Sequence, residues 1–248
     1  MKATYVLWLR QLKRYTRTRW RMLGSLGQPI LFLLALGFGF GPIYAKAGGG
    51  DYLQFLAPGV IAMTVLFTAT FSAMEIIWDR QIGFLKETLV APVSRFEIIL
   101  GKILGGSTVA IFQGLLVFAV CFIAGFRPTS LIMLPVALLF LFLIGFFFTA
   151  LGSAIASHME DMQAFPIILN FFIMPLFFLS GALYPLDGLP KALDIVARFN
   201  PLSYGVDGLR GALTGASHFG IGLDLGVLLI LSLILAFIGS YLFSRIQL

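Results

Sequence analysis

The sequence predicts an all-α, polytopic membrane protein with six transmembrane helices, and three observations support this fold class. Of the 248 residues, 59% are hydrophobic and only 11% are charged, whereas a soluble domain carries roughly 25% charged residues. The mean hydropathy is +0.99. Long apolar stretches with few charges recur from Leu26 to Phe243. A water-soluble core cannot absorb this apolar excess, so we expect one transmembrane domain over residues 1–248.

The chain begins with a basic amphipathic segment, residues 2–22. Its apolar members recur at helical spacing and are Tyr5, Trp8, Leu12 and Tyr15. Its basic members lie mostly elsewhere around the helix and are Arg10, Lys13, Arg14, Arg17 and Arg21. This pattern is typical of a helix that lies in the membrane interface, and a solvated basic tail is the alternative. A cleaved signal peptide is not expected, because the basic region is too long and the next apolar stretch exceeds 7–15 residues.

Six apolar stretches follow, and each has the ~20 residues needed to cross the hydrocarbon core. They cover about Leu26–Tyr44, Phe55–Trp78, Ile103–Phe126, Leu131–Ala156, Ala164–Leu183 and Ile221–Phe243. The connections between them are polar, and the longest is residues 79–102. We therefore expect six spans, with Pro166 and Pro175 interrupting the fifth.

The pattern changes in residues 184–220, between the fifth and sixth stretches. A short amphipathic helix is expected over residues 191–199. Asn200-Pro201 then predicts a new helix, because Asn caps free N–H groups and Pro suits the first helical position. Asp207 and Arg210 are three residues apart and could pair on that helix. Neither helix is long enough to span, so we expect an outer helical hairpin that lies at, or dips into, the interface.

The distribution of Lys and Arg predicts the orientation in the membrane. With the N-terminus in the cytoplasm, twelve of the 17 Lys and Arg residues face the cytoplasm, Arg245 among them. This bias predicts that both termini are cytoplasmic, although the connection at residues 157–163 has no Lys or Arg and carries Glu160 and Asp161. The net charge of +6 comes from residues beside the spans. It therefore indicates contact with lipid headgroups rather than nucleic acid.

The connection at residues 79–102 is the most informative segment for function. We expect a short helix there, whose one side consists of Phe84, Leu85, Thr88 and Leu89. Pro92 ends this helix, because the residue before a proline is pushed out of helical geometry. Ser94, with Glu97 three residues later, has the spacing of a capping box. Such a helix with apolar tips suits docking into a groove on a cytosolic partner, and an amphipathic loop resting on lipid is the alternative.

Three blocks of the sequence resemble one family in the family's own order. The first is Gly83-Phe84-Leu85-Lys86-Glu87 with Leu89-Val90-Ala91-Pro92-Val93-Ser94-Arg95 and Leu100-Gly101-Lys102. The second is Pro175-Leu176-Phe177-Phe178-Leu179-Ser180-Gly181-Ala182-Leu183-Tyr184-Pro185-Leu186, and the third is Asn200-Pro201-Leu202-Ser203-Tyr204-Gly205-Val206-Asp207-Gly208-Leu209-Arg210. The chain thereby resembles the ATP-binding-cassette (ABC) transporter permeases of the export type-two family, especially the drug-resistance branch with its daunorubicin-type exporters. Phe84 and Lys86 depart from many relatives, which have Thr-Leu-Glu after the glycine.

The resemblance implies a permease in the inner (plasma) membrane that pairs with a second permease copy and with cytosolic ATPase subunits. It implies export of an amphipathic or hydrophobic substrate: a drug, a lipid or a lipid-linked glycan. The residues implied in coupling to the ATPase are Gly83, Phe84, Leu85, Glu87, Thr88, Leu89 and Pro92. The residues implied in an outer gate are Pro185, Asn200, Pro201, Tyr204, Asp207 and Arg210.

The residues themselves indicate where the ATP is bound. A phosphate-cradling loop needs the pattern Gly-x-x-x-x-Gly-Lys-Ser/Thr, and Gly101-Lys102 is followed by Ile103. We therefore expect no cofactor in this chain, with ATP and magnesium on the partner ATPase. We also expect no catalytic or metal site, since His158 and His218 are far apart in the predicted topology.

Several features keep more than one interpretation. Glu75, Asp79 and Asp224 lie near span ends, and intramembrane acids are functional candidates, but solvation at the headgroup level explains them as well. Three glycine pairs have the spacing of a helix-packing motif and are candidates for a dimer contact, although chance pairs are expected among 27 glycines: Gly37/Gly41, Gly101/Gly105 and Gly222/Gly226.

Three other functions compete with an ABC permease. A secondary transporter or channel would carry charges for ion coupling, which the deep interiors of spans three to five lack. An intramembrane enzyme would carry paired acids or histidines at one depth. A non-transporting membrane scaffold is left open by the sequence.

Overall fold

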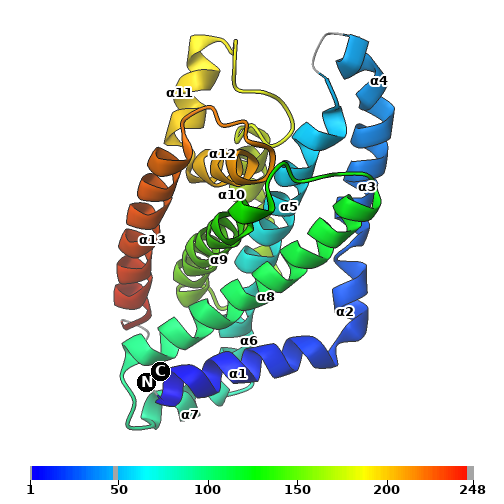
Figure 1. Cartoon of the computed structure of the whole chain (residues 1–248). Coiled ribbons are helices and arrows are strands. Elements are labelled where there is room, and N and C mark those ends of the chain that lie inside the picture. Colours follow the sequence, from blue (N-terminus) through cyan, green and yellow to red (C-terminus); the bar gives the residue numbers. More distant parts are fainter. Residues whose placement is uncertain (1, 47–49, 245–248) are drawn as a thin grey trace.

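The computed structural model describes residues 2–46 and 50–244 and places them in helices joined by short connections (Figure 1). Arg245, which contributes to the predicted orientation, lies outside the described residues. In chain order the helices are α1 (Lys2–Arg17), α2 (Arg19–Gly24), α3 (Gly27–Phe32), α4 (Gly39–Lys46), α5 (Tyr52–Ser72), α6 (Met74–Gln81), α7 (Phe84–Val90), α8 (Arg95–Ile123), α9 (Leu134–Ser157), α10 (Ala164–Phe178), α11 (Lys191–Phe199), α12 (Pro201–Thr214) and α13 (Ile221–Ser244). The predicted all-α class is confirmed for this part of the chain.

Within the described residues, five helical stretches are long and apolar enough to cross a membrane. They are Met22–Lys46, Tyr52–Gln81, Arg95–Ile123, Leu131–Ser157 and Ile221–Phe243. The first of them contains a π-helical segment, Leu33–Phe38, between α3 and α4. α10 has only 15 residues, which is about 22 Å of helix against roughly 30 Å of hydrocarbon. The sixth span therefore stays a prediction for this segment.

The fifth apolar helix ends earlier than the sequence pattern predicts. We expected it to reach Leu183, but α10 ends at Phe178. The chain then turns through Ser180 and Gly181, whose φ of 73° is in the left-handed region. Ser180 closes the end of the helix by donating to the carbonyl of Phe177 at 2.7 Å. Hydropathy alone missed this boundary, because Leu179, Ala182 and Leu183 on either side of the turn continue the apolar stretch.

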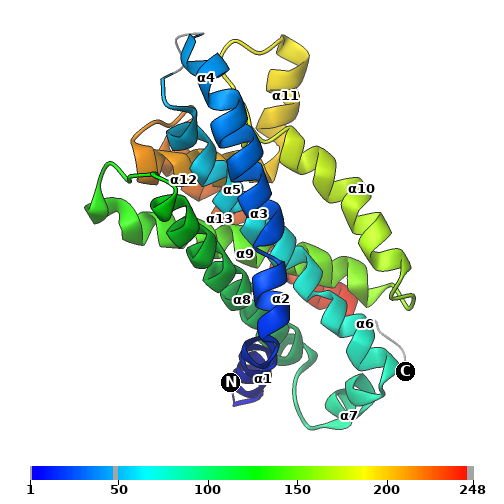
Figure 2. The ribbon, with the colours of Figure 1, turned by 90° about the vertical axis from the view of Figure 1, so that its right-hand side faces the viewer.

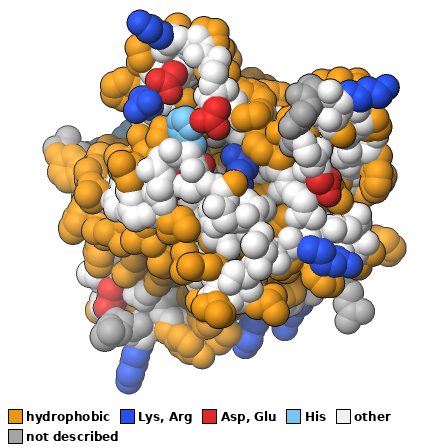
Figure 3. All heavy atoms as spheres, turned by 45° about the horizontal axis from the view of Figure 1, so that its top comes forward, with side chains coloured by type: hydrophobic (Ala, Val, Ile, Leu, Met, Phe, Trp, Pro, Cys, Tyr) orange, Lys and Arg blue, Asp and Glu red, His pale blue; other side chains and the backbone are white. Residues whose placement is uncertain are grey.

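α5 is the central helix of the bundle. Its residues from Leu56 to Leu66 are all buried, and the helix packs against α8, α9 and α12. Figure 2 shows α3 and α4 running along α5, with α10 splayed to one side. Hydrophobic side chains cover much of the surface seen from the α11 end (Figure 3), as expected for a protein surrounded by lipid.

α1 packs along the first half of α8, at the end of the bundle where α6 and α7 also lie (Figure 1). Two glycines of α8 make this close approach possible. A Cβ atom on Gly101 would lie 2.9 Å from the carbonyl oxygen of Thr4, and one on Gly105 would overlap the side chain of Gln11. These glycines therefore receive α1 of the same chain, and the dimer contact considered for them is wrong. The predicted basic segment at residues 2–22 is also broken, since α1 ends at Arg17 and α2 begins at Arg19.

Candidate functional site

The predicted coupling segment forms α7, and its local sequence explains both ends. Gly83 precedes the helix with a φ of 78°, and Ala91 is already extended, as expected for a residue before Pro92. Ser94 then caps α8 by accepting a hydrogen bond from the Glu97 amide at 3.1 Å. The predicted short helix and the predicted cap are confirmed.

The side of α7 that we expected to touch a partner faces the rest of this chain instead. Leu85 is only 1% exposed and belongs to a buried cluster with Leu7 and Ile76. Phe84 and Leu89 are half-buried against the same cluster. Leu85 therefore packs within the chain and is not a contact tip. This part of the prediction is wrong because amphipathic spacing identifies an apolar side without identifying what covers it.

The exposed side of the segment consists of other residues. Val90 is 79% exposed and Ile82 is 56% exposed. Lys86, Glu87 and Pro92 are also exposed. Neither Ile82 nor Val90 is among the predicted coupling residues. Their sequence positions indicate this exposure: Ile82 lies just before α7 and Val90 is its last residue.

A buried cluster of charges joins α7 to the elements around it. Asp79 on α6 is fully buried, and both of its carboxylate oxygens accept hydrogen bonds from Arg10 on α1, at 2.8 and 3.1 Å. Lys102 on α8 also donates to Asp79. The proposed solvation of Asp79 at the headgroup level is therefore wrong. Two cations from two other helices take the place of water.

Arg10 also contacts the coupling helix directly. Its guanidinium carbon lies 3.8 Å from the centroid of the Phe84 ring, within cation–π distance. The hydrogen bonds to Asp79 raise the pKa of Arg10 above its usual value, so this side chain stays charged. One residue thus ties α1 to both α6 and α7.

A second set of bonds links the same region to the connection after α9. Arg80 donates to the carbonyls of Ser157 and Met159 at 2.8 and 3.0 Å. Gln81 donates to the carbonyl of Glu160 at 3.3 Å. The connections at residues 79–102 and 157–163 therefore lie at the same end of the bundle, as a protein with alternating spans requires.

The predicted outer-gate residues lie at the other end, on α12 and the connections beside it (Figure 1). Asn200 caps α12 by accepting from the Leu202 amide at 3.0 Å, and Pro201 is the first helical residue. Asn200 also donates to the carbonyl of Leu176 at 2.6 Å, which joins α12 to α10. The predicted helix start is confirmed, and α12 is largely buried among α5, α9 and α13.

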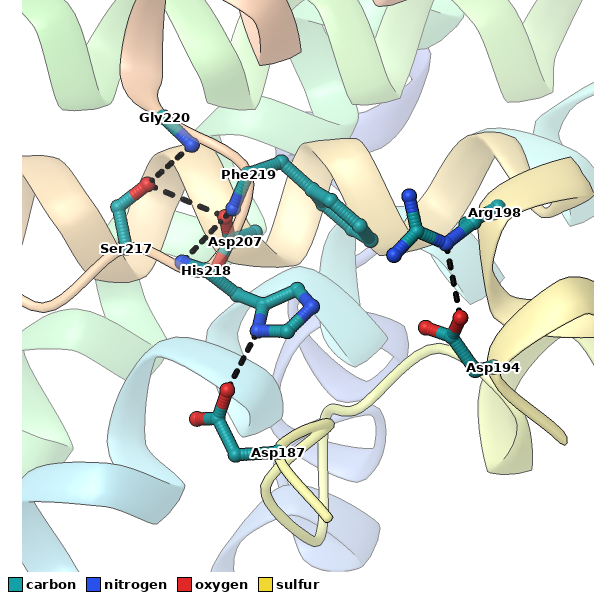
Figure 4. Close-up of polar contacts among 8 residues, drawn as sticks. All are labelled: Asp187, Asp194, Arg198, Asp207, Ser217, His218, Phe219 and Gly220. Atoms are coloured by element: carbon teal, nitrogen blue, oxygen red, sulfur yellow. Dashed lines mark hydrogen bonds and ion pairs between the residues drawn. The ribbon is translucent and has the colours of Figure 1, made fainter. Parts of the chain in front are cut away.

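Asp207 holds the loop between α12 and α13 (Figure 4). It is 2% exposed and accepts hydrogen bonds from the backbone amides of His218 and Phe219, each at 2.8 Å. The hydroxyl of Ser217 donates to it at 3.1 Å. A carboxylate that accepts from three donors of one short loop fixes the path of that loop.

Arg210 points away from this network, and the predicted Asp207–Arg210 pair is wrong. Arg210 donates to the carbonyl of Gly181 at 2.8 Å and lies 4.0 Å from the centroid of the Phe55 ring. No ion pair joins it to Asp207 among the described residues. Burial lowers the pKa of Arg210 to about 10. Arg210 thus connects α12 to the turn after α10 and to α5.

The remaining outer-gate candidates surround the α12–α13 loop. The Tyr204 hydroxyl donates to the carbonyl of Arg198 at 2.7 Å, and its ring lies 5.0 Å from that of Phe219. Burial raises the pKa of Tyr204. His218 pairs with Asp187 through a 2.7 Å contact (Figure 4). Pro185 is half-buried in the same connection as Asp187.

Asp224, in the first turn of α13, has a different environment from the one considered for it. It is fully buried, and neither carboxylate oxygen has a hydrogen-bond partner among the described residues. Solvation at the headgroup level is therefore wrong for Asp224 as well.

The fold defines a multi-pass helical membrane protein. At one end of the bundle a short helix, α7, is packed against the rest of the chain, and at the opposite end lies a buried polar network. The profile of the ABC-2 type transporter family matches residues 2–214, and the chain belongs to this family. It is 32% identical to the ycf38 transport permease of Cyanophora paradoxa, over 95% of this chain and 84% of that protein. It is 30% identical to Nodulation protein J of Rhizobium leguminosarum bv. trifolii, over 90% of this chain and 86% of that protein.

Family membership sets the class of activity and the kind of partner. The chain is a transporter permease and not an enzyme. An ABC-2 permease works in a membrane with an ABC ATPase.

Proposed function

We propose that this chain is the membrane-spanning subunit of an ATP-driven exporter of an amphipathic or hydrophobic substrate: a drug, a lipid or a lipid-linked glycan. Two copies of the chain and two cytosolic ATPase subunits form the working assembly, in the inner membrane. Both termini are cytoplasmic, and the drug-resistance branch is the part of the family it resembles.

The observation that carries this proposal is the way α7 is held. The helix is anchored through Leu85 and through the ring of Phe84 under Arg10, while Ile82 and Val90 remain exposed. A short helix that is rigidly attached and has exposed apolar residues suits contact with a cytosolic ATPase subunit, whose conformational change it would transmit to the transmembrane helices. A loop resting on lipid needs no such buried charge cluster behind it.

The outer end supports the same proposal. Arg210 connects α12 to α5 through the Phe55 ring, Asn200 connects it to α10, and Asp207 connects it to the loop before α13. We infer that Pro185, Asn200, Pro201, Tyr204, Asp207 and Arg210 together form an outer gate that closes the path between export cycles.

The test is reconstitution with the ATPase subunit in liposomes, with daunorubicin and a fluorescent phosphatidylethanolamine as probes. We expect co-purification of the two chains in equal amounts, ATP hydrolysis by the complex and movement of at least one probe that vanadate stops. ATP hydrolysis by the isolated chain, or probe transport by the complex that vanadate does not inhibit, would contradict the proposal.

One observation favours a secondary transporter, namely the buried and unpartnered Asp224, since intramembrane acids often bind coupling ions. The same liposomes separate the two functions. Transport driven by a proton gradient in the absence of ATP would support the secondary transporter, and transport that requires ATP and tolerates a protonophore would exclude it.

A further inference from the structure

A cavity of about 260 Å³ lies where α1, α3 and the second half of α5 meet. Its wall combines charged, polar and aromatic side chains, among them Gln11 and Arg14 of α1, Phe67, Phe71 and Ser72 of α5 and Glu75 of α6. Neither the predicted coupling residues nor the predicted outer-gate residues line it. The function argued above therefore leaves this cavity unexplained.

The side chain of Gln11 indicates that the cavity binds a ligand. Its side chain is only 5% exposed and lines the cavity. Its amide makes no hydrogen bond to any other described residue. Its amide is not one of the fully enclosed polar atoms without a partner, so it is reachable from the cavity and can both donate to and accept from a ligand there.

The hydroxyl groups of the wall set the polarity of that ligand. Thr64 donates to the carbonyl of Val60 at 2.9 Å, and Ser72 donates to the carbonyl of Ala69 at 2.6 Å. Each hydroxyl has one hydrogen to donate and two lone pairs that accept. Their hydrogens are already used, so they offer acceptors to the cavity. The ligand must therefore carry hydrogen-bond donors such as hydroxyl or amide groups.

The charged and aromatic side chains of the wall indicate the charge of the headgroup and the nature of the apolar part of the ligand. Arg14 and Glu75 both line the cavity, and their opposite charges balance, which favours an uncharged headgroup over an anion or a cation. The rings of Phe67 and Phe71 are nearly parallel, 6.3 Å apart between centroids. They form a flat apolar wall suited to a chain or to the apolar face of a ring.

We propose that this cavity receives the headgroup of the exported amphiphile, and that it takes an uncharged headgroup rich in hydroxyl or amide groups. The apolar part of the molecule lies against Phe67 and Phe71. The proposal rests on the export function and adds to it a loading site within one permease chain, beside the N-terminal helix.

The test uses the full chain in lipid nanodiscs with n-octyl-β-D-glucoside as the probe, below its micelle-forming concentration. Thr68 lines the cavity, and Thr68→Cys in a Cys121→Ala background supplies a thiol to alkylate with N-ethylmaleimide. Lys86→Cys, exposed on α7, is the matched control. At a probe concentration about three times Kd, alkylation at position 68 should slow about fourfold, with the control rate unchanged.

Three further arms define the site. Gln11→Met keeps the volume of the side chain and removes its amide, so it should abolish the protection while the unfolding midpoint stays near that of the parent. n-Octyl phosphate, which is anionic, and methyl glucoside, which has no chain, should protect weakly or not at all. Equal protection by n-octyl phosphate or methyl glucoside, protection that survives Gln11→Met, or no protection by n-octyl-β-D-glucoside would overturn the assignment.

The labelling needs no ATPase, so its result is independent of the export assay. Protection at position 68 without any ATP-driven transport would remove the export function and leave the binding site. ATP-driven transport without protection would remove only the site.

Discussion

Arg10 and Asp79 are 69 positions apart in the sequence and form a bidentate ion pair, in which Nη1 of Arg10 donates to Oδ2 of Asp79 and Nη2 donates to Oδ1. Asp79 is completely buried, and Lys102 is the second cation on the same carboxylate. This arrangement fixes the first helix of the chain to α6 and α8. Because Arg10 also covers the ring of Phe84, the position of the coupling helix depends on this pair.

Removing the buried acid should destabilise the protein. Asp79→Asn leaves the buried Lys102 and the half-buried Arg10 without the carboxylate that both contact, and breaking a buried ion pair typically costs about 3–5 kcal/mol. We expect a clearly lower unfolding midpoint in detergent. Glu87→Gln, an exposed acid on α7, is the control and should unfold like the parent. Equal midpoints for the two variants would show that the charge cluster does not stabilise the fold.

Changing the cation that contacts Phe84 should affect coupling more than assembly. Arg10→Lys keeps the charge but loses the bidentate geometry that suits a carboxylate. We expect the ATPase to co-purify in normal amount while probe export per ATP falls. Arg17→Lys, an exposed change on the same helix outside the α1–α5 cavity, makes no hydrogen bond to Asp79 and should not change this ratio. A loss of bound ATPase in Arg10→Lys would assign Arg10 to assembly instead.

The exposed residues of the coupling segment should carry the contact with the ATPase. Val90→Asp and Ile82→Asp place a charge where an apolar contact is expected, and a residue that anchors an interface is worth more than ~1 kcal/mol, or about a fivefold loss of affinity. Lys86→Ala should retain most binding, because exposed ion pairs are worth only ~0–1 kcal/mol. The measurement is the amount of ATPase that co-purifies. Full binding by both Asp variants would remove the docking role of this surface.

The sequence predicted those parts of the candidate sites that depend on neighbouring residues. The ends of α7 follow from Gly83 and Pro92, and the start of α12 follows from Asn200 and Pro201. The direction in which Leu85 points could not be predicted, because it depends on α1 and α6 packing over it. The same holds for the cluster around Asp79, whose partners come from two distant helices.

The orientation in the membrane can be tested on residues that the structure describes. Cysteines at positions 86 and 160 should react from the cytoplasmic side only, and a cysteine at position 190 should react from outside. An impermeant thiol reagent on intact cells, in a Cys121→Ala background, gives the measurement. Labelling of position 86 but not 190 would reverse the predicted orientation.

The last prediction concerns the outer network around Asp207. Its carboxylate holds three donors of the loop that precedes α13, and hydrogen bonds to a charged acceptor are worth about 1.5–3 kcal/mol each. Asp207→Asn keeps the shape of the side chain but removes the charge, and one of its two oxygens becomes an NH₂ donor that faces backbone amides. The loop at residues 215–220 should therefore open more often, and its amides should exchange hydrogen faster.

Hydrogen exchange measured by mass spectrometry checks this expectation, with the peptide over α7 as an internal reference at the opposite end of the bundle. Asp187→Asn is the matched control. Asp187 is 81% exposed, and its carboxylate is paired only with the His218 ring among the described residues, so its loss should change exchange in the loop far less. If the outer gate closes the path, Asp207→Asn should also let a probe leak across the membrane without ATP, and Asp187→Asn should not. Faster exchange without leakage would separate the structural role of Asp207 from the gate.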